Sequence, residues 1–113
     1  MNAVIRFPDA RGKSSSLHFT RAEFHRLLSL YSKRVMTGEW RDYAISFGPA
    51  MANFFVFRHA FENPLFVISK LDPRGRGRNG RFLVSSHGQK LYQGHALEDA
   101  LAIFDRPMRV ITG

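Results

Sequence analysis

The chain has 113 residues, of which 44% are hydrophobic and 13% aromatic, a composition that suffices for one domain around a single packed core. It contains no cysteine, which excludes disulfides, thiolate catalysis and cysteine zinc sites. The formal net charge is +8, and such an excess either favours anionic partners, above all nucleic acid, or keeps a small domain soluble.

The hydropathy pattern indicates no membrane or export segment. No apolar run approaches the ~18 residues of a membrane-spanning helix, and the first residues, MNAVIRFPDARGK, lack the apolar core of a signal peptide. We therefore expect a soluble, cytoplasmic protein that does not bind membranes.

The first segment of the chain has the composition of a loop. Residues 8–16 read PDARGKSSS, a run of small, polar and turn-forming residues after a short apolar piece. We expect residues 1–16 to form a flexible or partly ordered segment, and residues 17–113 to form a single α+β domain.

Residues 21–37 are predicted to form an amphipathic helix. Thr20 and Glu23 have the spacing of a capping box, in which each side chain accepts a hydrogen bond from the backbone amide of the other residue. Apolar residues follow at helical spacing, and Gly38 suits the C-terminal cap. We expect the buried face of this helix to contain Phe24, Leu27, Leu28 and Tyr31.

From residue 42 the hydrophobic period changes to two, which is typical of strands. Short runs of this kind cover residues 42–47, 53–59, 65–71, 81–85 and 90–93. A second short helix is expected within residues 96–105, and a last strand at residues 108–111. The fold class is therefore α+β, an antiparallel β-meander of about five strands preceded by one amphipathic helix, with a second short helix near the C-terminus.

Aromatic residues near the first strands are candidates for a protein-interaction site. In the strand at residues 53–59, successive phenylalanines point to opposite faces, so that both faces are apolar. Helices or a partner chain over both faces would explain this pattern, and exposed aromatics that stack on RNA bases are the alternative. The only tryptophan precedes the first strand, where it either seals the core or docks a partner. The interaction candidates are Trp40, Phe54, Phe55 and Phe57.

Residues 75–80 read G-x-G-x-x-G, and an arginine occurs at every second step of the surrounding sequence. In a dinucleotide-binding fold this motif follows a strand and opens a helix, whereas here β-prone residues follow it. The other motifs of a protein kinase are also missing. We interpret the glycines as a flexible connection between two strands.

The excess positive charge is concentrated in residues 1–13, 20–37 and 72–81. This clustering favours a noncatalytic module that binds nucleic acid, RNA rather than DNA, or another anionic partner. The alternative is a protein-interaction or regulatory domain that binds a protein partner or forms a homodimer. The candidate phosphate contacts are Arg74, Arg76, Arg78 and Arg81 in the glycine-rich stretch and Arg26, Lys33 and Arg34 on the first helix.

Catalytic patterns are weak throughout the sequence. The five histidines show no metal-ligand spacing, and the adjacent Glu98 and Asp99 would point in different directions on a helix. We expect no catalytic residue, no cofactor site and no metal site. Enzymatic activity would require residues that only the fold brings together.

The segment GEWRDYAI at residues 38–45 is the least generic stretch, and the helix FTRAEFHRLLSLYSKRV precedes it. Together with PLFVISK and GHALEDAL, it resembles an uncharacterised family of small alphaproteobacterial proteins, a domain of unknown function. The resemblance runs from about Leu17 to Val110. It implies a bacterial, cytoplasmic protein and brings no activity or catalytic residue.

Overall fold

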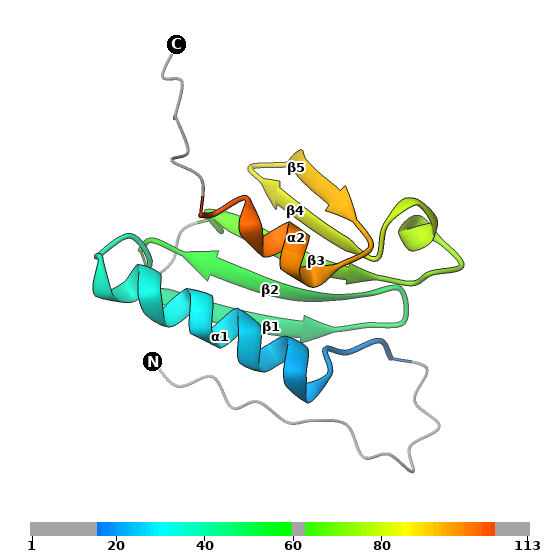
Figure 1. The fold of residues 1–113 in the computed structure, drawn as a ribbon, viewed down its shortest axis with the longest axis horizontal. Helices are drawn as coiled ribbons and strands as arrows, with labels where there is room; N and C mark the ends of the chain where they lie inside the picture. The colour runs from blue at the N-terminus through cyan, green and yellow to red at the C-terminus, as the bar shows by residue number, and fades with distance from the viewer. Residues whose placement is uncertain (1–15, 60–62, 106–113) are drawn as a thin grey trace.

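Five antiparallel strands in sequence order form one sheet, and the helices lie on one of its faces (Figure 1). The computed structural model describes residues 16–59 and 63–105. Its elements are α1 (Arg21–Met36), β1 (Asp42–Phe47), β2 (Met51–Phe57), β3 (Phe66–Leu71), the 3₁₀ helix η1 (Arg76–Asn79), β4 (Phe82–Ser86), β5 (Gln89–Gly94) and α2 (Leu97–Ala102).

The predicted fold class is confirmed, since a helix precedes a five-stranded antiparallel meander and a short helix follows it. Two expectations lie outside the described residues: the last strand at residues 108–111, and the N-terminal segment at residues 1–16 apart from Ser16. Leu17 forms an isolated antiparallel bridge with Gly48, in the turn between β1 and β2.

Alternation along β2 separates the two faces of the sheet. Ala52, Phe54 and Val56 are completely buried beneath the helices, whereas the intervening Phe55 and Phe57 are half-buried on the opposite face. Residues paired across the strands share a face, so the buried row continues into β1, β3 and β4. In the described part of the chain, helices cover only one of the two faces. The expectation of helices over both faces is therefore met on one side only.

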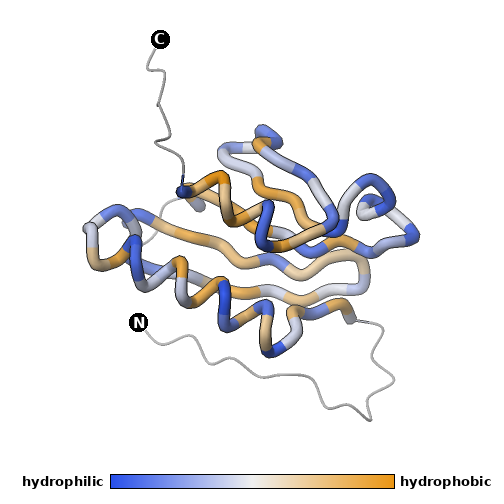
Figure 2. Tube along the Cα trace, viewed as in Figure 1, coloured by the Kyte–Doolittle hydropathy of each residue, from blue (hydrophilic) through white to orange (hydrophobic). Residues whose placement is uncertain are grey.

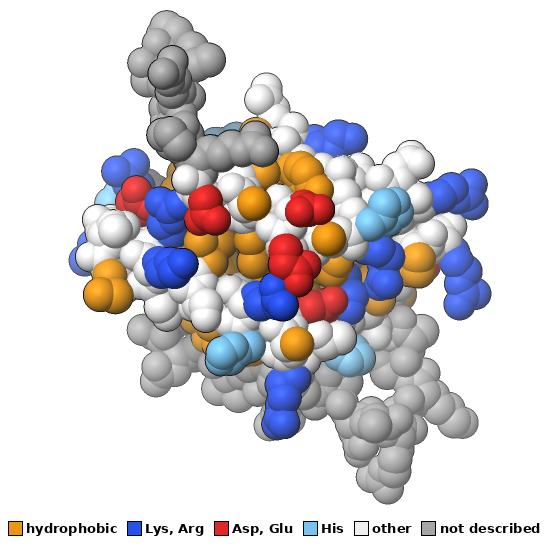
Figure 3. All heavy atoms as spheres, in the orientation of Figure 1, with side chains coloured by type: hydrophobic (Ala, Val, Ile, Leu, Met, Phe, Trp, Pro, Cys, Tyr) orange, Lys and Arg blue, Asp and Glu red, His pale blue; other side chains and the backbone are white. Residues whose placement is uncertain are grey.

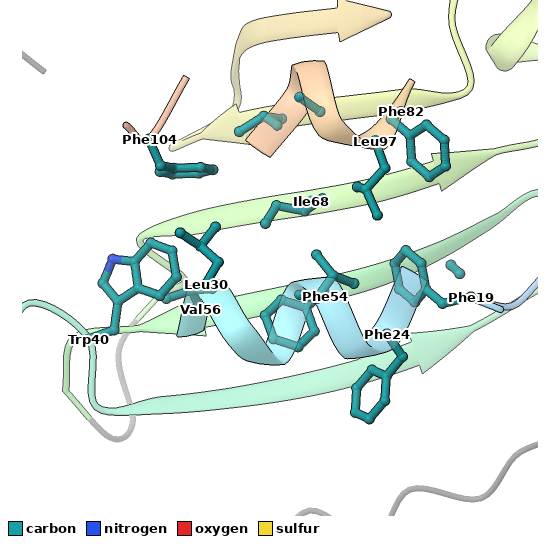
Figure 4. Close-up of a cluster of buried hydrophobic side chains, with 14 residues drawn as sticks. Phe19, Phe24, Leu30, Trp40, Phe54, Val56, Ile68, Phe82, Leu97 and Phe104 are labelled. Carbon is teal, nitrogen blue, oxygen red and sulfur yellow. The ribbon is translucent and has the colours of Figure 1, made fainter. Parts of the chain in front are cut away.

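The core lies between this sheet and the helices (Figures 2 and 4). The helix α1 contributes Phe24, Leu27 and Leu30, whereas Leu28 and Tyr31 are only half-buried at its flank. The buried face of α1 therefore includes Leu30 where we expected Leu28 and Tyr31. The reason is that α2 packs beside α1 and covers the flank that carries Leu30.

The predicted capping box at the start of α1 is confirmed. The Glu23 amide donates to Thr20 Oγ1 at 3.1 Å, and the Thr20 amide donates to Glu23 Oε1 at 2.8 Å. The same carboxylate oxygen accepts a bond from Lys70 Nζ at 2.8 Å, and Lys70 also donates to the His18 carbonyl at 3.2 Å. This nearly buried ion pair attaches the start of α1 to β3 and could not be predicted from local sequence patterns, because its partners lie 47 residues apart.

Trp40 seals the end of the core, which is the first of the two roles expected for it; the other was to dock a partner. The indole is only 3% exposed, and its ring centre lies 5.4 Å from that of Phe104 and 6.1 Å from that of Phe66 (Figure 4). Phe54 is also fully buried. These two interaction candidates therefore lie in the core of the described structure and offer no docking surface.

Candidate functional site

The glycine-rich stretch forms a compact, hydrogen-bonded loop between β3 and β4, which we call the arginine loop (residues 72–81). The Asp72 carbonyl accepts bonds from the amides of Gly75 and Gly77, at 3.0 and 2.9 Å. The Asp72 carboxylate accepts from the Arg74 amide at 3.0 Å. The structure thus shows a folded turn containing η1 where we expected a flexible connection.

Packing requires two of the three glycines of this loop, Gly77 and Gly80, whereas a Cβ on Gly75 would make only ordinary contacts. A Cβ on Gly77 would lie 2.7 Å from the Asp72 carbonyl oxygen and 2.9 Å from that of Leu71. Gly80 has a φ of 149°, and a Cβ there would lie 2.7 Å from the Gly94 amide nitrogen. The strand β4 follows the third glycine, so no helix N-terminus faces a pyrophosphate. The glycines of the motif therefore allow the loop to pack closely against the backbone of residues 71, 72 and 94.

Gln93 on β5 joins the arginine loop to the far edge of the sheet. Its Nε2 donates to the carbonyls of Arg76 and Gly80, at 3.0 and 3.1 Å. Its Oε1 accepts a bond from Lys90 Nζ at 3.3 Å. One amide thus fixes the loop backbone and also orients a neighbouring ammonium group.

A β-bulge decides which face of the sheet Lys90 occupies. Val84 pairs with Tyr92, but Ser85 pairs with Lys90, so that Leu91 is the extra residue on β5. Without the bulge, Leu91 would stand beside Ser85 on the face away from the helices. With it, Lys90 stands there together with Gln93, and Leu91 is 43% exposed.

A pocket of about 570 Å³ lies between the arginine loop and the β4–β5 hairpin, on the face of the sheet away from the helices. We call it the cationic pocket; its lining residues are Leu71, Arg76, Leu83, Ser85, Gly88, Lys90 and Gln93. Arg76 and Lys90 are the charged residues among the described lining residues, and none of these carries a carboxylate. The pocket therefore has a positive electrostatic potential above an apolar floor of two leucines.

The four arginines of the loop fall into two groups. Arg74, Arg76 and Arg78 are exposed, and none forms an ion pair with another residue in the ranges 16–59 and 63–105. Arg81 is half-buried, and its Nε donates to the Leu71 carbonyl at 2.9 Å. Blue side chains gather in Figure 3 at the end of the molecule where Figure 1 places this loop. Three arginines are thus available to a ligand, and Arg81 supports the loop.

Carboxylates engage two of the four arginine and lysine residues of α1. Arg26 pairs with Glu98 of α2 at 2.6 Å, and Arg34 pairs with Glu39 at 2.8 Å. The Arg34 guanidinium also donates to the Phe104 carbonyl. Lys33 forms no ion pair within the described ranges, but acidic and basic side chains alternate over α1 and α2 in Figure 3.

The structure does not unite the two predicted groups of phosphate contacts. The helix α1 covers one face of the sheet, whereas the cationic pocket opens on the other face. Because Arg26 and Arg34 are also neutralised, the helix cannot extend the positive surface of the loop. The candidate site therefore contains the arginine loop and Lys90, a residue that the sequence analysis did not select.

Phe55 and Phe57, the remaining interaction candidates, lie half-buried on the same face as the cationic pocket. Beside the row that contains Phe55 runs a row of polar side chains on three strands. Ser69 Oγ donates to Asn53 Oδ1 at 2.7 Å, and Asn53 Nδ2 donates to Ser46 Oγ at 3.2 Å. Both rows lead across the sheet to the pocket, the first through Val67 to Ser85 and the second through Ser69 to Leu83.

Other chemistry is sparse in the described ranges. They contain no group of three or more histidine or acidic residues that could hold a metal ion. Burial, and then the nearby Asp42 and Tyr43, raise the pKa of Tyr31, which packs beside β1 and lies outside the pocket. No helix among the described residues is long and apolar enough to cross a membrane.

A comparison with protein-family models finds a match over most of the chain. Residues 17–101 match a family model described as a protein of unknown function, DUF2794. Among curated proteins and solved structures, nothing matches.

Proposed function

The chain belongs to this family of proteins of unknown function, DUF2794, and from its own surface we propose a noncatalytic module that binds single-stranded nucleic acid, RNA rather than DNA. The binding surface consists of the arginine loop, the cationic pocket and the adjoining face of the sheet, which none of the described helices covers. The observation that carries the proposal is that Arg74, Arg76 and Arg78 are exposed on a hydrogen-bonded loop and form no ion pair with another described residue.

The binding energy comes mainly from the attraction between the loop arginines and the phosphates of the nucleic acid. Arginines that neutralise phosphates release counterions, and this gain does not depend on base sequence. The Asp72 carbonyl and the Gln93 amide hold the loop in shape before a ligand arrives. Because less backbone has to be ordered on binding, each phosphate contact retains more of its interaction energy.

The aromatic residues favour a single strand over a duplex. Val67 pairs with Phe55 on one side and with Ser85 of the pocket on the other, so Phe55 lies two strands, ~10 Å, from Ser85. A strand that leaves the pocket along this face reaches Phe55 and then Phe57, where unpaired bases can stack for ~1–3 kcal/mol each. A duplex keeps its bases stacked internally and offers no such contact.

The polar row beside the aromatic residues supports the preference for RNA. The Ser46 hydroxyl is exposed and accepts a bond from Asn53, so its own hydrogen remains to be donated. The 2′-hydroxyl, which distinguishes RNA from DNA, is both a donor and an acceptor. A strand on this face would bring its ribose groups to this row.

Fluorescence anisotropy with labelled single-stranded RNA, single-stranded DNA and duplex DNA tests the proposal. We expect salt-sensitive binding that is strongest for single-stranded RNA and is weakened in the double variant Arg74→Ala/Arg78→Ala. The control variant Arg21→Ala/Lys33→Ala has the same net charge but changes exposed residues of α1, on the other face of the sheet. Absence of binding at low salt, or equal weakening in the two variants, would refute the proposal.

A second candidate function is a protein-interaction or regulatory role that includes self-association. The specific observation is the apolar pair Phe55 and Phe57 on a face that no described helix covers. Sedimentation of the wild type and of Phe55→Ser/Phe57→Ser would detect it. A dimer that the double substitution dissociates would favour this function over nucleic-acid binding.

A further inference from the structure

We propose that the cationic pocket is a subsite for a phosphate monoester together with its attached nucleoside, the chemistry found at a phosphorylated strand end. The inference rests on the proposed function, because it takes the end of the bound strand as the ligand. It goes further by assigning a preferred chemical group to one defined part of the surface.

The charge of the pocket matches a monoester better than a diester. A phosphate monoester carries a charge of about −1.5 to −2 at neutral pH, whereas each internal phosphodiester of a strand carries a single negative charge. Arg76 and Lys90 both line the pocket, and none of the lining residues in the described part of the chain is acidic. Arg76 and Lys90 are thus both available to a single phosphate group. A terminal phosphate, with nearly two negative charges, neutralises both of them.

The two cationic residues are connected before a ligand binds. Gln93 donates to the Arg76 carbonyl at 3.0 Å and accepts from Lys90 Nζ at 3.3 Å, so that one amide links the two walls of the pocket. The bulge at Leu91 turns Lys90 toward the pocket, which is a recurrent role of bulges at binding sites. A phosphate therefore meets groups that need little rearrangement.

The size and floor of the pocket favour a phosphate that carries a nucleoside. Its volume of about 570 Å³ falls within the ~300–1,000 Å³ of small-molecule sites and exceeds the needs of a bare phosphate. Leu71 and Leu83 provide apolar surface for a sugar or base. The Ser85 hydroxyl also lines the pocket and makes no hydrogen bond with another described residue, so it is available to a ligand.

The test compares three single-stranded RNAs of one sequence that end in a 5′-phosphate, a 3′-phosphate or hydroxyl groups only. We expect one of the phosphorylated RNAs to bind at least about tenfold more tightly than the hydroxyl-ended RNA, because the added bonds are charge-assisted. If the 5′-phosphorylated RNA binds more tightly, the pocket holds the 5′ end of the strand; if the 3′-phosphorylated RNA does, it holds the 3′ end. By calorimetry, a nucleoside monophosphate should bind more tightly than inorganic phosphate.

Variants assign the preference to the pocket. Lys90 is exposed, so Lys90→Gln should fold normally and lose the preference for the phosphorylated end, while Lys90→Arg should retain it. The control Lys33→Gln removes an exposed lysine of α1, on the other face of the sheet, and should leave the preference intact.

Equal affinity for phosphorylated and hydroxyl-ended RNA would overturn the inference, as would a preference that survives Lys90→Gln. In either case, salt-sensitive binding of hydroxyl-ended RNA would still support the proposed function. Failure of every RNA to bind at low salt would instead refute the proposed function itself.

Discussion

Gly77 offers a sharp test of why the arginine loop contains its glycines. In Gly77→Ala the new methyl group would lie 2.7 and 2.9 Å from the carbonyl oxygens of Asp72 and Leu71, so backbone atoms must move. Overpacking of this kind costs ~1–3 kcal/mol, from which ~0.4–1 kcal/mol is regained because alanine restricts the unfolded chain. We therefore expect a net loss of about 1–2 kcal/mol in the free energy of unfolding.

Urea unfolding and thermal melts provide the measurement. For a domain of this size, ~1 kcal/mol shifts Tm by ~4–8 °C, so Gly77→Ala should melt several degrees below the wild type. The control is Gly48→Ala in the β1–β2 turn, where the nearest atom would lie at an ordinary 3.5 Å, and its Tm should hardly change. Equal stability of the two variants would show that the glycine spacing does not serve packing and would reopen the phosphate-cradle interpretation.

Three further variants test the rest of the fold. Leu27→Ala should cost ~2–5 kcal/mol in urea unfolding, and Leu28→Ala less than half of that, because only Leu27 is fully buried. Glu23→Gln, which breaks a nearly buried ion pair, should destabilise the protein by ~1–3 kcal/mol in thermal melts, whereas Arg26→Gln, which breaks an exposed pair, should cost under ~1 kcal/mol. Burial raises the pKa of Tyr31, so its stabilising contribution is complete below the unfolded pKa of ~10 and is lost as the pH rises through the folded pKa. Unfolding measured at alkaline pH should therefore show a smaller loss of stability in Tyr31→Phe than in the wild type.

Local sequence patterns were sufficient for the secondary structure and the order of strands. The Thr20–Glu23 capping box acts within one helical turn, and the alternation along β2 follows from strand geometry alone. The direction of each phenylalanine in β2 was therefore predictable. What covers each face was not, because that depends on the distant segments α1 and α2.

The candidate site was only partly predictable for the same reason. Arg26 and Arg34 looked like phosphate contacts on a helix, but the fold supplies Glu98 to the first and the Phe104 carbonyl to the second. Lys90 was overlooked, because a strict period of two does not reveal the bulge that turns it toward the pocket. Leu30 was likewise missed, since only the docking of α2 buries that flank of α1.

The most direct test of the proposed function is the salt dependence of single-stranded RNA binding. If the three exposed loop arginines and Lys90 each contact a phosphate, log K should fall with log salt at a slope of about −2.8, a loss of ~50-fold in affinity between ~50 and ~200 mM. In Arg74→Ala/Arg78→Ala the slope should be about −1.4 and the loss ~7-fold, whereas Arg21→Ala/Lys33→Ala should behave like the wild type. A slope near zero for the wild type, or one that the loop substitutions leave unchanged, would contradict the account.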